Sequence, residues 1–339
     1  MKLSDVARLA EVSVTTASYV INGQAAQRRI SAATVARVQA VVERYGYRPD
    51  QQAAGLRRGQ SHCLGLIIPD LENPSYARTA KFLEQLARAA GYQLLIASSD
   101  DEPDSERQLV ELFRSRRCDA LVVASCLPQE DPTYAQLVEA GLPVIALDRA
   151  LDPQYIRSVV SDDQQAGALL TASLLEPPPR HIVLIGARPE LPISQAREAG
   201  FREGLDGFAG KLSVLHGAEF SRACGCEQMQ ALLRYEPMPD ALITTAYVLL
   251  EGVFEALQQQ DWPGMAAPRL ATFGDTRLLD FLPLRVNAIS QQHERLAERI
   301  LYWVLQGIEH GNYEPGLEAI PRVLKNRSQR QPAVTENAR

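Results

Sequence analysis

A regular alternation of two kinds of segment dominates the chain from residue 62 to residue 328. Short runs rich in Val, Ile and Leu cover 63–69, 93–97, 120–124, 143–147, 181–186, 240–245, 269–274 and 287–290. Amphipathic stretches of helical spacing cover 78–91, 105–116, 163–175, 194–205, 226–236, 248–260 and 294–308. Repeated strand–helix alternation is typical of parallel sheets with helices on both faces. The number of units predicts two such sheets, and hence an α/β domain of two lobes over 62–328.

The first 60 residues differ from the rest in charge. They contain nine Lys and Arg and four Asp and Glu, a balance of +5, while the whole chain of 339 residues carries −6. A basic segment ahead of an acidic body indicates that this segment alone has a polyanionic partner. The length and the 46% of hydrophobic residues predict two or three globular domains.

Three helices are predicted within the basic segment. Ser4, Ser13 and Ser31 each stand where a hydroxyl can cap a first helical turn, and Gly46 ends the third helix as a C-cap. Only three residues separate the first two helices, which is the spacing of a helix-turn-helix motif. We therefore expect a three-helix head over residues 1–48.

The second helix lies in SVTTASYVIN at 13–22, an uncharged stretch rich in hydroxyl groups. Ala17, Val20 and Ile21 share one face and can join a small core. The opposite face offers hydrogen-bonding groups and methyl groups, which suit base edges in the DNA major groove, while nearby arginines suit phosphates. A solvated helix explains this face alone equally well, but the positive charge favours DNA. The candidate DNA-contacting residues of the head are Ser4, Val14, Thr15, Thr16, Ser18, Tyr19 and Asn22.

The stretch YRPDQQAAGLRRGQS at 47–61 follows the third helix. Asp50 can cap a helix of about two turns, which is unstable in isolation and forms only against a partner. Leu56 is the single large apolar residue of this short helix, and two arginines follow it. A lone exposed leucine beside basic residues is typical of a side chain that wedges into the DNA minor groove. On spacing alone, a flexible linker with one leucine is the simpler interpretation. Residues 49–61 are therefore assigned as a hinge helix or linker, with Ala53 and Leu56 as candidate DNA contacts.

The head resembles the N-terminal region of the lactose-repressor (LacI/GalR) family of transcriptional regulators. The segments that carry the resemblance are MKLSDVARLAEVS, SYVIN and YGYRPDQQAAGL. At the hinge positions of the family the chain has Tyr47, Pro49, Ala53 and Leu56, with Asp50 where asparagine is usual. The resemblance implies that Val14, Thr15 and Tyr19 are the principal base readers and that Leu56 intercalates. It also implies double-stranded DNA as the partner, through a near-palindromic operator.

Polar residues follow several predicted strands of the body. Open α/β sheets bind ligands beyond the carboxyl ends of their strands. Carboxylates and amides bind sugar hydroxyls, an aromatic ring covers an apolar sugar face, and two arginines indicate an anionic group. Each residue alone is more readily structural, but their recurrence at strand ends indicates a binding site. The candidate effector-binding residues are Asn73, Ser75, Tyr76, Ser125, Asp148, Arg149, Arg197, Asp275 and Gln291.

The body resembles the effector domain of the same family, which is shared with periplasmic sugar-binding proteins. Asp148, Arg149, Arg197, Asp275 and Gln291 stand at its ligand positions. The chain departs from the family at 246–247, where Ala-Tyr replaces the Asn-Asp of sugar-binding relatives. This departure argues against a free pentose or galactoside as the ligand.

Within the family the chain is similar to the fructose repressors, through segments such as GYQLLIA, ALDRALD and PMPDAL. This similarity implies a repressor, and also an activator, of sugar and central carbon metabolism. It implies fructose 1-phosphate as the effector that releases the operator, with fructose 1,6-bisphosphate weaker. A homodimer or homotetramer is expected. The tail lacks the heptad leucines of the lactose repressor, and residues 329–339 are expected to be disordered.

Two other classes of protein share parts of this pattern. A nucleotide-dependent α/β enzyme would need a phosphate-binding signature, but the first strand ends in PDLENPSY and neither a P-loop nor a GxSxG elbow is present. A sugar-phosphate-binding module for transport would not need the basic head.

No cofactor or metal is implied by the sequence. The five cysteines include no CxxC pair and are expected to be reduced, and the histidines show no HExxH spacing. No run of 18 uncharged apolar residues occurs, and acidic residues interrupt the N-terminal segment. A cytoplasmic protein without a membrane partner is therefore expected.

Leu56→Ala is expected to weaken binding to operator DNA far more than binding to unrelated DNA, because a minor-groove wedge is inserted only on the bent specific site. Gel-shift titrations with an operator duplex and a scrambled duplex measure the two affinities. Equal losses on both duplexes would identify residue 56 as part of an ordinary linker.

Overall fold

The structure, a computed structural model, describes residues 1–47, 60–128, 131–259, 267–311 and 314–328. The chain divides into two compact units, Met1–His62 and Cys63–Arg339. Each unit has a hydrophobic core of its own. Most of the predicted hinge, with Ala53 and Leu56, and the predicted tail at 329–339 lie outside the described residues.

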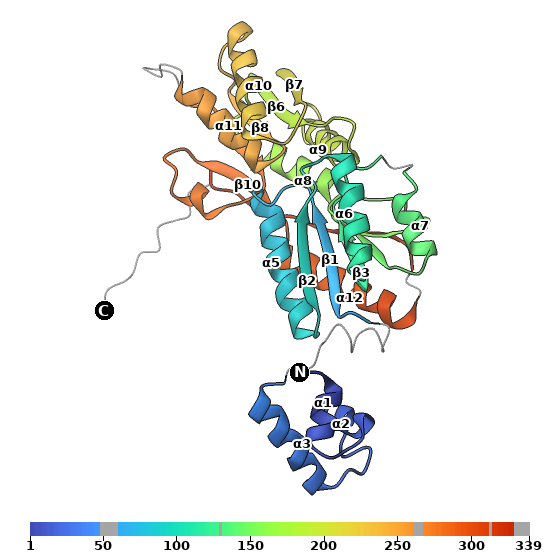
Figure 1. Ribbon diagram of the computed structural model, residues 1–339. Helices are drawn as coiled ribbons and strands as arrows, with labels where there is room; N and C mark the ends of the chain where they lie inside the picture. Colours follow the sequence, from blue (N-terminus) through green and yellow to red (C-terminus); the bar gives the residue numbers. More distant parts are fainter. Residues whose placement is uncertain (48–59, 129–130, 260–266, 312–313, 329–339) are drawn as a thin grey trace, which may run out of the picture. The chain divides into compact units, whose positions relative to one another are not determined.

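Three helices make up the described part of the first unit (Figure 1): α1 (Leu3–Leu9), α2 (Val14–Ile21) and α3 (Ala32–Tyr45). Their shared core contains Val6, Ala10, Val20 and Val38. A short turn joins α1 to α2, so the predicted helix-turn-helix is present and a third helix packs against it.

Side-chain caps set the starts of α2 and α3. Ser13 Oγ accepts the backbone N–H of Thr16 at 3.0 Å, and Ser31 Oγ accepts that of Thr34 at 3.3 Å. Gly46 closes α3 with a φ of +59°, a left-handed conformation that glycine adopts without steric cost. These three predicted helix boundaries are confirmed.

The predicted cap of the first helix is wrong. α1 begins at Leu3, so Ser4 lies exposed inside its first turn instead of preceding it. The physical reason is an alternative cap, because Asp5 accepts the backbone N–H of Lys2 at 2.9 Å, so Lys2 becomes the N-cap residue and the helix starts two residues earlier than a Ser4 cap would place it.

Two six-stranded sheets form the second unit, one in each lobe. The sheet of the first lobe has the order β11-β5-β4-β3-β1-β2, and its strands are all parallel. These strands are β1 (Cys63–Ile68), β2 (Gln93–Ser98), β3 (Ala120–Val123), β4 (Val144–Leu147), β5 (Arg157–Ser161) and β11 (Gly316–Ile320). The predicted α/β architecture with parallel sheets is confirmed.

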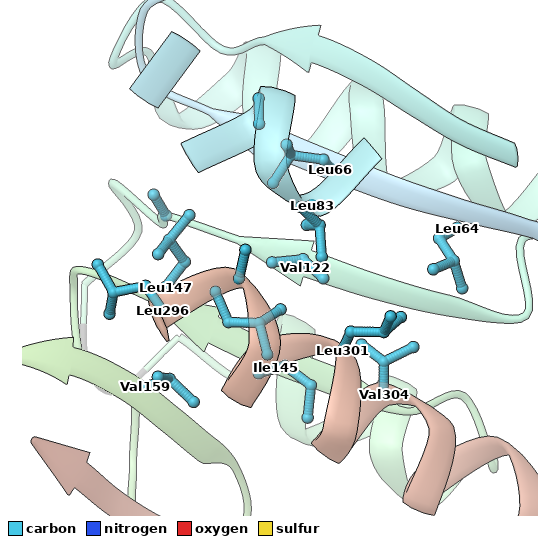
Figure 2. Packing of buried hydrophobic residues seen from close by; sticks show 14 of the residues in the cluster. Leu64, Leu66, Leu83, Val122, Ile145, Leu147, Val159, Leu296, Leu301 and Val304 are labelled. Atoms are coloured by element: carbon cyan, nitrogen blue, oxygen red, sulfur yellow. The ribbon is translucent and has the colours of Figure 1, made fainter. Parts of the chain in front are cut away.

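Helices cover both faces of the first sheet. One face carries α5 (Pro74–Ala89) and α12 (His293–His310), and the other carries α6 (Pro103–Ser115) and α7 (Thr133–Glu139). Figure 2 shows the first of these cores, where Leu64 and Val122 from the strands lie near Leu83 from α5 and Val304 from α12. Each of these side chains is fully buried, which stabilises the lobe by about 1.5–3 kcal/mol per residue.

The second lobe repeats the arrangement, with one antiparallel edge strand. Its order is β12-β10-β9-β8-β6-β7, and β12 is antiparallel to β10. The strands are β6 (His181–Ala187), β7 (Lys211–Gly217), β8 (Ala241–Thr244), β9 (Arg269–Phe273), β10 (Val286–Ser290) and β12 (Val323–Lys325). One face carries α10 (Arg222–Tyr235) and α11 (Tyr247–Gln258), and the other carries α8 (Asp163–Ala172) and α9 (Pro192–Glu203).

The described chain passes between the lobes three times. It leaves the first sheet after β5 and enters α8, returns after β10 into α12, and passes again from β11 to β12. The crossing points are Asp162, Gln291–Gln292 and Pro321–Arg322. Parallel strands end at the same edge of a sheet, so the crossings lie next to the carboxyl ends of both sheets.

Among the described residues, four strands and one α-helix are not predicted by the sequence: β5, β7, β11, β12 and α7. Three of these strands, β7, β11 and β12, lie at sheet edges, where exposed side chains interrupt the apolar run that marks a central strand. β5 reads RSVVS, too short and too polar to stand out, although it is almost wholly buried. Within the described ranges, no helix combines the length and apolar character that crossing a bilayer requires.

Glycines bring α10 and α11 together backbone to backbone. A Cβ atom on Gly252 would lie 2.0 Å from the carbonyl oxygen of Arg222, and one on Gly225 would lie 2.3 Å from that of Leu249. Both distances are far below van der Waals contact, so neither position can hold a larger residue unless the helices separate.

Gly252→Ala is expected to destabilise the second lobe by about 1–3 kcal/mol, because overpacking outweighs the better helix propensity of alanine. Urea unfolding monitored by circular dichroism gives the change in the free energy of unfolding. The matched control is Gln258→Ala on the exposed side of the same helix, which should stay within about 0.5 kcal/mol of the unsubstituted chain. A stabilised Gly252→Ala variant would contradict the close crossing.

Candidate functional site

A cavity of about 270 Å³ opens between the two lobes. It is lined by residues that follow strands of both sheets and by the crossings between lobes, which is where open α/β sheets bind ligands. Its volume suits a small metabolite. The lining residues are Pro69, Asp70, Asn73, Pro74, Ser75, Tyr76, Arg78, Asp100, Asp101, Asp148, Arg149, Ile193, Arg197, Glu219, Phe220, Ser221, Thr245, Ala246, Tyr247, Phe273, Gly274, Asp275, Thr276, Gln291, His293 and Arg322.

Asp148, which follows β4, is the centre of a buried hydrogen-bond network. Its Oδ1 accepts Gln291 Nε2 at 2.6 Å, and its Oδ2 accepts the hydroxyl of Tyr76 at 3.0 Å. Gln291 also accepts the hydroxyl of Ser75 and donates to Ser161 Oγ at 3.1 Å. The network therefore links the start of α5 and the end of β4 to two of the lobe crossings.

Electrostatics keep Asp148 ionised. Burial alone would raise the pKa of its carboxyl group, but the guanidinium groups of Arg197 and Arg322 and the hydrogen bond from Tyr76 outweigh burial. The pKa consequently lies below its ordinary value. At neutral pH Asp148 is thus a pure acceptor, able to bind a hydroxyl group of a ligand.

Two arginines share one carboxylate at the first lobe crossing. Asp163 Oδ1 lies 3.2 Å from Arg197 Nε and 2.8 Å from Arg322 Nη2. Both guanidinium groups also lie over the ring of Phe273, with 5.0 and 5.4 Å from Cζ to the ring centroid. All three ionic side chains are less than a tenth exposed, and the cluster carries one positive charge in excess.

The donors of this cluster are not all used. Arg197 Nη1 donates to the carbonyl oxygen of Thr245 at 2.9 Å, whereas Arg322 Nε is buried without a hydrogen-bond partner among the described residues. A buried, unpaired charged donor is costly unless something else accepts from it. The wall formed by Arg197 and Arg322 is therefore suited to an anionic group.

A second ion-pair network spans the lobes. Arg149 of the first lobe donates to both oxygens of Asp101, with Nη1 to Oδ1 at 2.5 Å and Nη2 to Oδ2 at 3.0 Å. Arg188, at the end of β6 in the second lobe, has its Nη1 3.6 Å from Asp101 Oδ2. Asp101 thus connects the two lobes, and any change in their separation changes this contact.

Three of the helices that begin at the cavity are α5, α10 and α11. Asn73 caps α5 by accepting the backbone N–H of Ser75 at 3.0 Å, and Ser221 caps α10 by accepting that of Cys224 at 3.1 Å. Ala246 precedes α11. The N-terminal end of a helix carries a partial positive charge, so all three ends favour a negatively charged ligand.

Eight of the nine predicted effector-binding residues line the cavity: Asn73, Ser75, Tyr76, Asp148, Arg149, Arg197, Asp275 and Gln291. Asp275 is already engaged there, because Arg327 Nη2 donates to its Oδ1 at 2.5 Å. Its carboxylate is therefore ion-paired before any ligand binds.

The ninth residue, Ser125, does not line the cavity. It is buried, and its hydroxyl donates to Glu106 Oε1 at 2.5 Å, which also accepts the hydroxyl of Tyr134 at 2.5 Å. Its carbonyl oxygen accepts Arg149 Nη1 at 3.3 Å. Ser125 thus supports a cavity residue instead of facing the cavity, because Glu106 on α6 pulls its side chain to the other side.

Several lining residues are not predicted by the sequence, among them Asp101, Thr245, Phe273, His293 and Arg322. Asp101 lies shortly after a predicted strand and Thr245 is the last residue of another, so inspection of every strand end would find both. Arg322 follows β11, a strand that the sequence does not reveal. Phe273 belongs to a strand, and nothing in the sequence distinguishes it from a core residue.

His293, at the start of α12, is held neutral below the cavity. Its Nδ1 lies 2.8 Å from the hydroxyl oxygen of Thr79, which itself donates to the carbonyl oxygen of Ser75 at 3.1 Å, so Nδ1 is the donor. Burial, with the charges of Arg78 and Arg322, lowers the pKa of His293 to about 4.

In the head, α2 presents the polar face that the sequence predicts. Its exposed and half-buried residues include Val14, Thr15, Thr16, Ser18, Tyr19 and the following Asn22, whereas Ala17 and Val20 are buried. Val14 is 47% exposed, so its methyl groups are accessible on this face. The amide of Asn22 donates to the carbonyl oxygen of Ser18 at 2.8 Å, so it also serves the end of α2.

Comparisons with known proteins match both the head and the body of the chain. The family of bacterial regulatory proteins called lacI matches residues 2–50, and the family of periplasmic binding proteins and the sugar-binding domain of LacI matches residues 61–273. The fructose operon regulatory protein of Vibrio cholerae is 48% identical over 97% of this chain and 100% of its own length. The catabolite repressor/activator of Escherichia coli K12 is 44% identical over 96% of this chain and 98% of its own.

A solved structure is also similar. It is that of the Cra transcriptional dual regulator from Pseudomonas putida in complex with fructose 1-phosphate. This structure is 58% identical in sequence, covers 78% of this chain and 98% of the compared chain, and has a TM-score of 0.76.

His293 should make the stability of the body depend on pH. The unfolded chain binds a proton at His293 near pH 6.5, but the native state resists it until about pH 4, so lowering the pH between these values favours unfolding. The contribution of neutral His293 to the free energy of unfolding is fully present above pH 6.5, and at pH 5 it is smaller by about 2 kcal/mol.

Urea unfolding of the protein and of His293→Gln at pH 7.5 and pH 5.0 measures this effect. The variant should lose less stability between the two pH values than the unsubstituted chain. His310→Gln, at the exposed end of the same helix, is the control and should leave the pH dependence unchanged. Identical pH dependence for both variants would show that His293 does not resist protonation.

Proposed function

The chain belongs to the LacI family of bacterial regulatory proteins, and from this membership and the cleft we propose that a phosphorylated sugar controls its binding to DNA. It is a DNA-binding transcriptional regulator, as its relatives are, and not an enzyme. The observation that carries the proposal is the pair of buried guanidinium groups, Arg197 and Arg322, that share the single carboxylate of Asp163.

The phosphate is assigned to the positively charged wall of the cavity. The Arg197–Arg322 pair has one excess positive charge and the unpaired donor Arg322 Nε. Planar guanidinium groups bind phosphate oxygens through paired N–H donors. The N-terminal ends of α5, α10 and α11 add to the positive potential.

The sugar hydroxyls are assigned to the opposite polar groups. Asp148 and Gln291 offer an ionised acceptor and an amide in a buried site, and Tyr76 covers the same wall. Tyr247 lines the cavity where sugar-binding relatives have a hydroxyl-binding side chain, and it hydrogen-bonds Glu251 of its own helix. The site thus depends on the phosphate more than on a full set of hydroxyl contacts.

Fructose 1-phosphate is the proposed effector, and fructose 1,6-bisphosphate a weaker one. The similar Cra structure contains fructose 1-phosphate, and the Vibrio cholerae relative is named for the fructose operon. The cavity has one concentrated anion-binding wall, and its lining also contains the carboxylates of Asp70, Asp100 and Asp101. A second phosphate on the same sugar would lie near these carboxylates.

The proposed switch is a change in the position of the two lobes relative to each other. A ligand held by Asp148 on the first lobe and by Arg197 on the second stabilises one separation of the lobes over others. The contact between Asp101 and Arg188 spans the same gap and responds to the same movement. The ligand acts only through its different affinities for the two states, typically about 1–3 kcal/mol of coupling.

The DNA side of the proposal assigns domains and contacts. Residues 1–48 form the head, 49–61 the hinge, and 62–328 the effector-binding and dimerisation body. Two copies in a homodimer, or four in a homotetramer, place paired heads on a near-palindromic operator. Base contacts are assigned to the exposed face of α2, from Val14 to Asn22, and the central wedge to Leu56. Because its partner is chromosomal DNA, we place the protein in the cytoplasm.

Arg197→Ala should lower the affinity for fructose 1-phosphate by about 10- to 100-fold, as expected for the loss of hydrogen bonds to a charged group. It should leave operator binding without sugar intact, because Arg322 still pairs with Asp163. Calorimetric titration with fructose 1-phosphate and with fructose measures the first effect, and gel shift with increasing sugar phosphate measures release.

The matched control is Arg202→Ala on the same helix. Its side chain is 52% exposed and pairs with Glu198 outside the cavity. Release by the sugar phosphate should be normal in this variant. An unchanged effector response in Arg197→Ala would reject the assignment of the phosphate wall.

A further inference from the structure

The connection between α2 and α3 is an ordered structure. It contains two residues in the left-handed conformation, Gly23 with φ +72° and, six positions later, Arg29 with φ +53°. After the first, Gln24 N–H donates to the carbonyl oxygen of Tyr19 at 2.8 Å, and after the second, Ile30 N–H donates to that of Ala25 at 2.9 Å. Both are the six-to-one hydrogen bonds with which helical turns end.

A single helical turn lies between these two stops. Arg28 N–H donates to the carbonyl oxygen of Gln24 at 3.1 Å, which closes that turn. Ala25 and Ile30 at its two ends pack against the core of the head. The turn is therefore fixed to the core by apolar contacts, and the direction of its outer side chains is defined.

The outer side chain of this turn reaches the second helix. The Arg28 guanidinium lies over the ring of Tyr19, with 4.7 Å from Cζ to the ring centroid. Arg28 is exposed and Tyr19 half-buried, and no carboxylate pairs with Arg28 in the described head. A guanidinium whose contact with a ring is through the ring face still has N–H donors for other acceptors.

We propose that Arg28 is a positioning residue for DNA recognition, which fixes the Tyr19 ring over the base edges while its free N–H groups contact a neighbouring phosphate. This inference rests on the proposed function, because it assumes that α2 lies in the major groove. Stacking removes the rotational freedom of the Tyr19 side chain before binding, so less entropy is lost on the operator. Arg28 therefore affects which base pair Tyr19 accepts, although it touches no base.

A purely electrostatic role for Arg28 makes a different prediction. A cation that only contacts phosphate strengthens binding to every sequence alike and steepens the salt dependence. A positioning role instead changes the ratio between affinities for the operator and for its single-base-pair variants, and it does so only while Tyr19 is present. The two roles can be separated in the full-length protein.

The head offers a matched control for the charge. The Arg44 guanidinium on α3 lies over the ring of Tyr45, with 5.7 Å from Cζ to the ring centroid, and neither residue lies on α2. Arg44→Ala removes the same charge and the same kind of contact without touching Tyr19. Arg28→Lys keeps the positive charge at residue 28 but loses the planar stack.

The probe is a duplex that the unsubstituted full-length protein selects from a randomised palindromic library. Fluorescence anisotropy gives the affinities for this duplex and for every single-base-pair variant of one half-site, in several KCl concentrations. The proteins compared are the unsubstituted chain, Arg28→Ala, Arg28→Lys, Arg44→Ala, Tyr19→Ala and the double variant of residues 19 and 28.

Arg28→Ala and Arg28→Lys should reduce discrimination by about two- to fivefold, the size of an exposed cation–π contact, at the base pairs where Tyr19→Ala also reduces it. The double variant should discriminate no worse than Tyr19→Ala, and Arg44→Ala should keep full discrimination. Equal discrimination by Arg28→Ala and the unsubstituted chain would overturn the inference. Failure of the unsubstituted chain to select any duplex would overturn the proposed function as well.

Discussion

A buried carboxylate shared by two guanidinium groups is the interaction on which the rest of the body depends. Asp163 opens α8 directly after the first crossing, Arg322 lies on the third crossing, and Arg197 reaches them from α9. Buried charges are tolerated only when they are paired, so these residues must lie together wherever the lobes are correctly joined. The junction between lobes and the anion-binding wall are consequently the same group of atoms.

The packing around this junction divides the body into rigid and adjustable parts. Each lobe is a sheet covered by helices on both faces, and in the second lobe Gly252 and Gly225 bring two helices into backbone contact. Cores packed in this way resist deformation. Within the described residues, the lobes are connected by three crossings of the backbone and by a few polar contacts, such as that between Asp101 and Arg188. Ligand binding is therefore expected to change the position of one lobe relative to the other and not the structure within each lobe.

In the head, local hydrogen bonds at the helix ends determine where the helices begin and end. Ser13 caps the start of α2, Ser31 caps the start of α3, and Gly46 ends α3. Short-range hydrogen bonds therefore fix these boundaries. Its small core then orients the polar face of α2 outward. The position of Arg28 depends on this core as well, because Ala25 and Ile30 hold the turn that carries it.

The sequence by itself determined the fold class, most of the strands and helices, and eight of the residues that line the cavity, because helical and strand periodicities are local and parallel strands place their ends together. It failed at three of the four edge strands, β7, β11 and β12, whose exposed side chains break the pattern, at the internal strand β5, and at the start of α1, where Lys2 and not Ser4 is the N-cap residue. Only the tertiary structure decided that Ser125 turns to Glu106 and that Arg322 joins Arg197. Those pairings join residues far apart in the chain, and no local spacing records which partner a buried polar group will find.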